Sequence, residues 1–171
     1  RKDPDARLQL MRASDITILC LPDEAARDAV ALADGDASIR FIDASTAHRV
    51  DQNWVYGFPE LTTAQRGMIA TAPRISNPGC YPTGFLALAR PLIESGILPA
   101  DCQRNVPAVS GYSGGGKSMI GAHDAGGLAP QFSYGVNLAH KHLAEMTHYA
   151  GLQTPPIFMP SVGDFYAGML V

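Results

Sequence analysis

The chain has 171 residues, of which 46% are hydrophobic and 17% charged, and its formal net charge is −3. This composition is typical of a globular protein of one large or two small domains. A pI of about 5.9 argues against nucleic acid or an anionic membrane as partner, because a nucleic-acid surface is basic. No apolar run approaches the ~18 residues of a membrane span, and the polar first residues lack a signal-peptide core. We therefore expect a cytoplasmic protein.

Three cysteines, Cys20, Cys80 and Cys102, are odd in number and widely spaced. That spacing argues against a disulfide framework and against a cysteine metal site, so no metal is expected. The first residue is not Met, and the last residues, YAGMLV, are apolar and strand-like without a closing turn. We expect the chain to be an internal piece of a longer protein.

The first third of the chain predicts a βαβ unit. Residues 16–21, ITILCL, are apolar without alternation and predict a strand buried on both faces, with Cys20 as a small buried side chain. Residues 23–34 have helical apolar spacing and end before Gly35, and residues 39–45 predict a second buried strand. The expected fold is an incomplete, Rossmann-like doubly wound parallel sheet.

Ligands of such sheets bind beyond the carboxyl ends of the strands. The residues placed there are Leu21, Pro22, Ser45, Thr46 and Arg49. The glycine-rich phosphate turn that normally opens a dinucleotide-binding domain is absent. Its absence fits a missing N-terminal part as well as it fits a domain that never bound a dinucleotide.

The middle of the chain predicts two helices. Residues 50–75 are turn-rich, with a short helix expected near 59–66. A longer apolar helix follows, with Pro82 in its first turn and Gly96 as its cap. Pro91 should kink or divide this helix.

The stretch SGYSGGGKS, residues 110–118, contains the letter pattern of a phosphate-binding P-loop. Residues 105–110 could be the preceding strand. No helix is expected after Ser118, because three glycines and a proline follow within twelve residues. We interpret the pattern as a chance match, with a nucleotide-binding module as the alternative of a different class.

Cys80 is the candidate nucleophile. It follows the turn Asn77-Pro78-Gly79 and precedes a helix, whose N-terminus should lower the thiol pKa and offer N–H groups to an oxyanion. The alternative is a small buried apolar residue.

The stretch HKHLAE, residues 140–145, offers a base for this thiol. His140 and His142 would point in nearly opposite directions on a helix, whereas on a strand they would share a face. We expect only one of them to reach the sulfur. The alternative is a pair of surface histidines at the start of a helix that turns Leu143 and Met146 inward. A metal site lacks supporting spacing.

The segment SNPGCYPTGFLALARP, with VYGFPEL before it and SGYSGGGKS and HKHLAE after it, resembles the N-acetyl-gamma-glutamyl-phosphate reductases of arginine biosynthesis, in their shorter form. The resemblance covers essentially the whole chain, but the family is longer at both ends. It implies the remainder of an NADP-binding domain over residues 1–76 and part of an α+β catalytic domain with a mixed sheet over residues 77–171. It also implies a homo-oligomer, dimer or tetramer. Aspartate-semialdehyde and glyceraldehyde-phosphate dehydrogenases are more distant relatives.

The resemblance implies that Cys80 attacks a small-molecule acyl phosphate, releases phosphate and forms a thioester that the nicotinamide hydride reduces to a semialdehyde. His140 would be the acid/base, with His142 as the alternative. Aspartyl phosphate and carrier-bound aminoadipyl phosphate are alternative substrates. A folded core without activity is a further alternative.

The implied binding residues fall into two sets. For the substrate they are Arg49, which would hold the phosphate, Asn77, Ser113, Lys117, Tyr134 and Glu145. For the cofactor they are Leu21, Pro22, Ser45, Gly84, Ser113 and Gly114. Lys117 stands where the longer form usually has arginine, which keeps the charge without the bidentate geometry. Arg49 as a surface ion-pair partner and Glu145 as a helix-surface glutamate are the alternatives.

Overall fold

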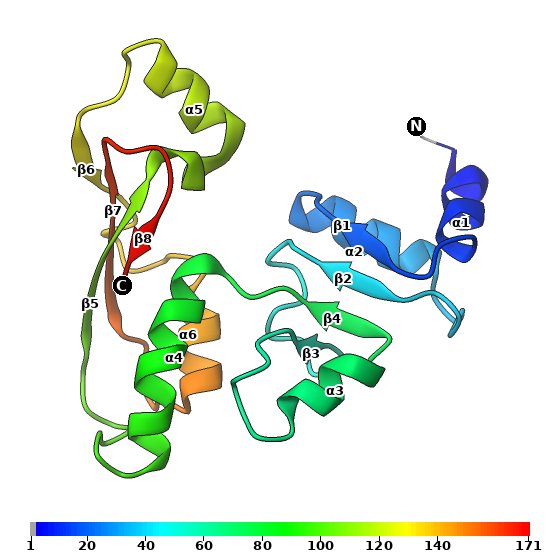
Figure 1. Ribbon diagram of the computed structural model, residues 1–171, viewed down its shortest axis with the longest axis horizontal. Helices are drawn as coiled ribbons and strands as arrows, with labels where there is room; N and C mark the ends of the chain where they lie inside the picture. The colour runs from blue at the N-terminus through cyan, green and yellow to red at the C-terminus, as the bar shows by residue number, and fades with distance from the viewer. Residues whose placement is uncertain (1–2) are drawn as a thin grey trace. The chain divides into compact units, whose positions relative to one another are not determined.

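The computed structural model describes residues 3–171 and divides into two compact units, the first ending at Gly79 and the second beginning at Cys80 (Figure 1). Each unit contains one β-sheet with helices packed against it. The first unit comprises α1 (Pro4–Arg12), β1 (Thr17–Leu19), α2 (Asp23–Leu32), β2 (Phe41–Asp43), β3 (Val55–Tyr56), α3 (Gln65–Thr71) and β4 (Arg74–Ser76).

The sheet of the first unit is entirely parallel, with strand order β1-β2-β4-β3. β1, α2 and β2 form the predicted βαβ unit, and β3, α3 and β4 form a second one. The α/β class with a parallel sheet is therefore confirmed. Its core lies between this sheet and the two helices α1 and α2. The core side chains are Met11, Leu19, Ala26, Ala29, Val30, Ala33, Ile39, Phe41 and Trp54.

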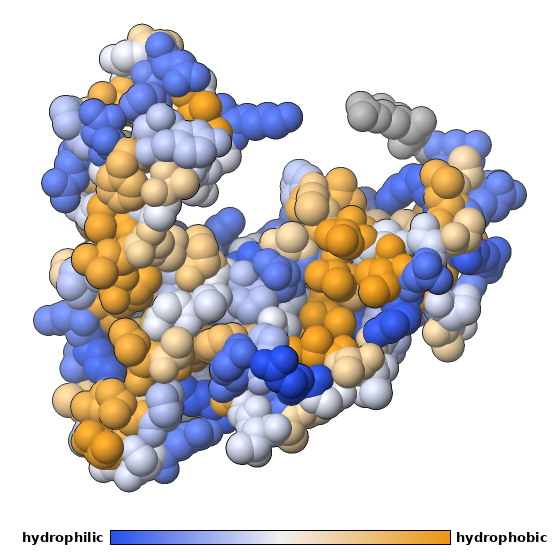
Figure 2. All heavy atoms as spheres, in the orientation of Figure 1, coloured by the Kyte–Doolittle hydropathy of each residue, from blue (hydrophilic) through white to orange (hydrophobic). Residues whose placement is uncertain are grey.

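β1 is not buried on both faces, so that prediction is wrong. Ile18 is 64% exposed, whereas its neighbour Leu19 is buried in the core. β1 pairs only with β2, and no described element of the first unit covers its face opposite α2. Figure 2 shows the resulting apolar area over β1 and β2. Cys20, expected to be buried, is exposed for the same reason.

The helix expected at residues 59–66 lies later, at Gln65–Thr71. The buried Gln65 side chain donates a hydrogen bond from Nε2 to the Tyr56 carbonyl, at 2.5 Å. This bond ties the start of α3 to the end of β3, and the residues before it form turns. A tertiary contact therefore sets where the helix begins.

The second unit contains a mixed sheet, as expected. Its elements are α4 (Cys80–Glu94), β5 (Asn105–Gly111), the 3₁₀ turn η1 (Tyr112–Gly115), α5 (Gly116–Asp124), β6 (Gln131–Ser133), α6 (Leu143–Ala150), β7 (Ile157–Gly163) and β8 (Met169–Leu170). The strand order is β6-β7-β5-β8. β5 and β7 pair in parallel over seven residues, and β6 and β8 flank them antiparallel. α4 and α6 pack against each other beside this sheet (Figure 1).

α4 runs unbroken through Pro91, contrary to the expected division. Because Pro91 has no N–H, the Ala87 carbonyl lacks its intrahelical hydrogen bond. Both residues lie on the exposed side of the helix, where water can replace this bond. Gly96 ends the helix as predicted. It has a φ of +73°, and its N–H bonds to the Ile93 carbonyl at 3.0 Å.

α5 follows the glycine-rich loop, so the expectation of no helix there is wrong. Within the helix only Gly121 interrupts the better helix formers, and the other two glycines lie beyond its end, at Gly126 and Gly127. The ring of His123 stacks on Tyr112 with centroids 3.7 Å apart and bonds to Asp164 at 2.9 Å. These tertiary contacts hold a helix of weak intrinsic propensity.

Two glycine substitutions test the packing of this region. A Cβ at Gly111 would lie 2.6 Å from the Phe165 carbonyl oxygen and 2.7 Å from that of Tyr166, and both are backbone atoms. Gly111→Ala should therefore lower the free energy of unfolding by about 1–3 kcal/mol. Gly121→Ala, which meets nothing within 4 Å, should raise it by about 0.5–1 kcal/mol. Urea denaturation followed by circular dichroism measures both; equal effects would contradict the packing.

Candidate functional site

Cys80 is the first residue of α4, and its side chain is exposed. The predicted position at a helix N-terminus is therefore confirmed, and burial as an apolar residue is not observed. A helix N-terminus combines N–H groups that lack intrahelical partners with partial positive charge. The sulfur is thus open to a substrate at the end of the helix that favours anions.

An aromatic cluster adjoins Cys80 in the sequence and in space. Tyr81 is buried, and its ring makes edge contacts with His140, His142 and Phe158 at centroid distances of 6.5, 5.9 and 5.1 Å. His140 in turn lies 5.7 Å from the ring of Tyr134. The structure therefore brings the two predicted histidines and Tyr134 together around Tyr81, a residue that the sequence analysis missed.

The two tyrosines form a hydrogen-bonded chain. Tyr134 donates to Tyr81, whose hydroxyl donates to the Ser161 carbonyl at 3.3 Å. Burial, and then this hydrogen bond, raise the pKa of Tyr134, with further contributions from the charges of Tyr81 and Cys80. Tyr134 is therefore protonated, and its single O–H is engaged with Tyr81, so that its oxygen is left as an acceptor.

His140 has a defined tautomer. Its Nδ1 accepts the backbone N–H of His142 at 3.1 Å, so the neutral ring carries its proton on Nε2. Burial, and then the charge of Lys141, lower the pKa of His140. The ring is accordingly neutral at pH 7 and offers an N–H donor from Nε2.

The alternatives that placed these residues on the surface are not observed. His142 is 5% exposed, and Glu145, in the first turn of α6, is 1% exposed. Leu143 and Met146 point into the core, as expected of the helix. Glu145 is therefore not a helix-surface residue, and its role in binding stays a prediction.

The first N–H groups of the glycine-rich loop are already bonded within the protein. The backbone N–H groups of Gly111, Tyr112 and Ser113 donate to the carbonyls of Gly168, Phe165 and Tyr166 at 3.0–3.1 Å. A P-loop would need such groups directed at phosphate. These bonds favour the chance-match interpretation, although the helix that it excluded is present.

The remaining predicted residues of the second unit differ in exposure. Gly114 and Lys117 are exposed, and Ser113 is half-buried. Gly84 faces the side chain of Val171, where an added Cβ would lie 3.2 Å from it. The roles of these residues in binding stay predictions.

In the first unit, the predicted residues line the carboxyl edge of the parallel sheet. Leu21, Pro22 and Asn77 are exposed there. Arg49 is 7% exposed and donates from Nη2 to the Ala44 carbonyl at 3.0 Å, so it is not a surface residue. The Ser45 hydroxyl donates to Asp43 at 2.7 Å and accepts the Ala47 N–H at 3.1 Å, which leaves it one acceptor lone pair.

Asp43 and His48 form a buried pair at this edge that the sequence analysis missed. Nδ1 of His48 lies 2.7 Å from Oδ2 of Asp43, and the imidazole stacks on Trp54 with centroids 4.2 Å apart. Asp43 is 0% exposed. In the sequence, the only sign of this pair was an aspartate at the end of an apolar strand.

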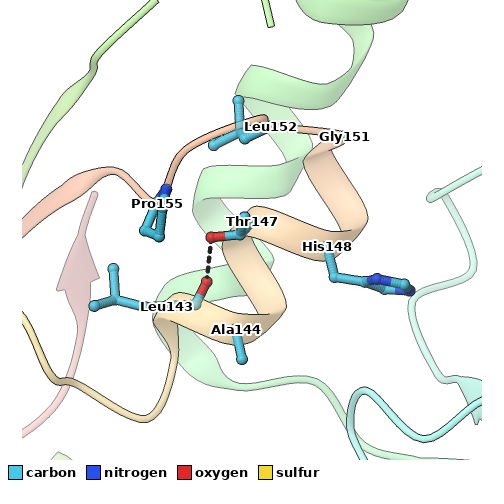
Figure 3. Close-up of a pocket in the computed structure, with 7 residues that line it drawn as sticks. All are labelled: Leu143, Ala144, Thr147, His148, Gly151, Leu152 and Pro155. Carbon is cyan, nitrogen blue, oxygen red and sulfur yellow. Dashed lines mark hydrogen bonds between the residues drawn. The ribbon is translucent and has the colours of Figure 1, made fainter. Parts of the chain in front are cut away.

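A hollow of about 570 Å³ lies along α6 and the segment after it (Figure 3). Its lining is Leu143, Ala144, Thr147, His148, Gly151, Leu152 and Pro155. The Thr147 hydroxyl turns back to bond the Leu143 carbonyl at 2.7 Å. None of the predicted site residues lines this hollow, so we do not assign it to the candidate active site.

Residues 3–171 hold no group of three or more histidine, cysteine or acidic side chains arranged to bind a metal ion. In the same range, no helix combines the length and apolar character that crossing a bilayer requires.

Comparison with known families agrees with this arrangement. Residues 80–171 match the family model described as "Semialdehyde dehydrogenase, dimerisation domain", and residues 3–68 match "Semialdehyde dehydrogenase, NAD binding domain". The chain belongs to the semialdehyde dehydrogenase family.

The predicted resemblance is also confirmed. The chain is 52% identical to N-acetyl-gamma-glutamyl-phosphate reductase 2 of Nostoc sp. strain PCC 7120, an alignment that covers 100% of this chain and 55% of the relative. It is 51% identical to the N-acetyl-gamma-glutamyl-phosphate reductase of Chelativorans sp. strain BNC1, over 99% of this chain and 55% of the relative. The chain therefore spans about 55% of the length of these curated relatives.

Solved structures share the fold. Aspartate semialdehyde dehydrogenase II from Vibrio cholerae is similar with a TM-score of 0.65 at 15% identity, over 93% of this chain and 54% of that one. Aspartate semialdehyde dehydrogenase from Candida albicans, crystallised with NADP, is similar with a TM-score of 0.57 at 12% identity, over 91% of this chain and 48% of that one.

Two histidines of the second unit should titrate on opposite sides of 6.5, the ordinary value. The hydrogen bond to Asp164 raises the pKa of His123, whereas burial lowers that of His140. NMR titration of the ring protons, assigned with His→Gln variants, measures both midpoints. Asp164→Asn should lower the His123 midpoint and leave that of His140 in place. A His140 midpoint above 6.5 would contradict its described surroundings.

Proposed function

We propose that this chain is the central part of an NADP-dependent N-acetyl-gamma-glutamyl-phosphate reductase, which converts the acyl phosphate to N-acetylglutamate semialdehyde and phosphate in arginine biosynthesis. The observation that carries the proposal is Cys80, exposed at the N-terminus of α4 beside the cluster of Tyr134 and His140. Identity of about 52% to reductases of that name, over the whole chain, supports it.

Cys80 would attack the acyl carbon as a thiolate. The new S–C bond forms as the C–O bond to phosphate breaks, and phosphate leaves with the electron pair. The N-terminus of α4 stabilises the negative charge that the carbonyl oxygen carries during attack. The product of this half-reaction is a thioester on Cys80.

His140 would act on the oxygen of the reacting carbonyl in the second half-reaction. NADPH, when bound, would supply the hydride that the thioester must gain. His140 is neutral and protonated on Nε2, so it can donate a hydrogen bond to this oxygen as the oxygen takes up negative charge. When the C=O bond forms again, the C–S bond breaks with its electron pair on sulfur, which releases the semialdehyde and restores the Cys80 thiolate.

The residues present fit the predicted cofactor in part. The carboxyl edge of a parallel sheet is where doubly wound folds hold dinucleotides, and exposed Leu21 and Pro22 lie there. The Ser45 hydroxyl donates its hydrogen to Asp43, so it could only accept a hydrogen bond from the cofactor. We assign Ser113 and Gly114 to the nicotinamide side.

The domain assignment and assembly belong to the same proposal. Residues 1–76 would be the remainder of the dinucleotide-binding domain, and residues 77–171 part of the catalytic domain. We also propose a homo-oligomer, dimer or tetramer, because residues 80–171 match a dimerisation domain of the family. A cytoplasmic location is proposed from the sequence composition alone.

Replacement of the nucleophile tests the proposal. In the full-length protein, Cys80→Ser and Cys80→Ala should lower kcat/KM for N-acetyl-gamma-glutamyl phosphate by at least about a thousandfold, because the thioester cannot form. NADPH oxidation at 340 nm measures the rate. Cys20→Ser and Cys102→Ser are matched controls, since both thiols are also exposed. Retained activity in both Cys80 variants would refute the mechanism.

A further inference from the structure

We propose that Asp43 is a positioning residue that shapes the loop of residues 44–49 for binding the phosphate group of the substrate. The inference rests on the proposed function, because the resemblance to that enzyme family implies that Arg49 holds the substrate phosphate. Asp43 itself is 0% exposed, so it cannot touch a substrate and must act through its neighbours.

The Asp43 carboxylate accepts three hydrogen bonds from this loop. Oδ1 accepts the Ser45 N–H at 2.9 Å. Oδ2 accepts the Ser45 hydroxyl and Nδ1 of His48, both at 2.7 Å. One buried carboxylate therefore fixes the second and the fifth residue of the loop.

The far end of the loop is fixed as well. His48 is 7% exposed and stacks almost parallel on Trp54, with an interplanar angle of 12°. Arg49 follows directly, and its guanidinium bonds back to the Ala44 carbonyl at 3.0 Å. The loop thus closes on itself, and the direction of Arg49 depends on where His48 is held.

The Asp43 backbone reaches a second predicted substrate segment. Its carbonyl accepts the N–H of Asn77 at 2.7 Å, at the end of β4. Thr46 bonds in turn to the carboxylate of Asp23, at the start of α2. Asp43 is therefore the point from which two substrate-binding segments of the first unit are aligned.

The carboxylate is chemically necessary for this arrangement. All three of its partners are donors, so two oxygens with several lone pairs are required. Asparagine in the same place would direct an N–H group at the Ser45 hydroxyl or at His48. Such a change leaves buried donors without an acceptor, which costs more than a lost surface bond.

The test compares Asp43→Asn, His48→Phe and Asp28→Asn in the full-length enzyme. His48→Phe keeps an aromatic ring on Trp54 and removes only the donor to Asp43. Asp28 is exposed on α2, so Asp28→Asn controls for the loss of one negative charge. The measurements are kcat and KM for the acyl phosphate, and KM for inorganic phosphate in the reverse reaction with semialdehyde and NADP at saturation.

Asp43→Asn and His48→Phe should each raise both KM values by about tenfold, the equivalent of one lost buried hydrogen bond, with kcat within about threefold of wild type. Unchanged KM values for both phosphate compounds would overturn the proposal. A loss of kcat at constant KM, with a lower melting temperature, would show a merely structural role and also overturn it.

Two results separate this proposal from the one on which it rests. If wild-type enzyme does not turn over the acyl phosphate, the proposed function fails and this inference fails with it. If wild type turns over and the variants behave like Asp28→Asn, only the positioning role fails. If Asp43→Asn does not fold, the KM of His48→Phe for inorganic phosphate decides whether the positioning role holds.

Discussion

The burial of Tyr81 is the constraint on which the candidate site depends. Its ring is enclosed by His140, His142 and Phe158, and its hydroxyl is anchored on the Ser161 carbonyl. These contacts fix the first turn of α4 against β7 and against the segment that leads into α6. With Tyr81 held inside, its neighbour Cys80 stays outside at the helix N-terminus, the position that a thiolate nucleophile requires.

In the first unit, buried hydrogen bonds rather than aromatic packing hold the candidate site residues in place. Its strands are short, with two or three residues each, so the loops at their carboxyl ends need their own support. Buried hydrogen bonds to Asp43 supply that support for the loop that carries Ser45 and Arg49. Such networks are costly when broken, which keeps a loop in one conformation before any ligand arrives. Both units therefore hold segments that carry candidate site residues in place by buried contacts.

Much of this arrangement could be predicted from the sequence. The βαβ unit, the start of α4 at Cys80 and the mixed second sheet followed from apolar patterns, turn residues and resemblance. Most of the errors concern tertiary contacts: the exposed face of β1, the start of α3 set by Gln65, and α5 held by His123. The predicted division of α4 at Pro91 failed because the residue is exposed. Tyr81 and Asp43 were missed because an aromatic or an acidic residue beside an apolar segment does not reveal its partners.

The most direct measurement is mass spectrometry of the full-length enzyme mixed with N-acetyl-gamma-glutamyl phosphate in the absence of NADPH. Without a hydride source the acyl group should remain on the enzyme. The account predicts a mass increase equal to the N-acetylglutamyl group, located by proteolysis on the peptide that contains Cys80 and removed by hydroxylamine. An adduct on another residue, or none under conditions in which NADPH supports turnover, would contradict it.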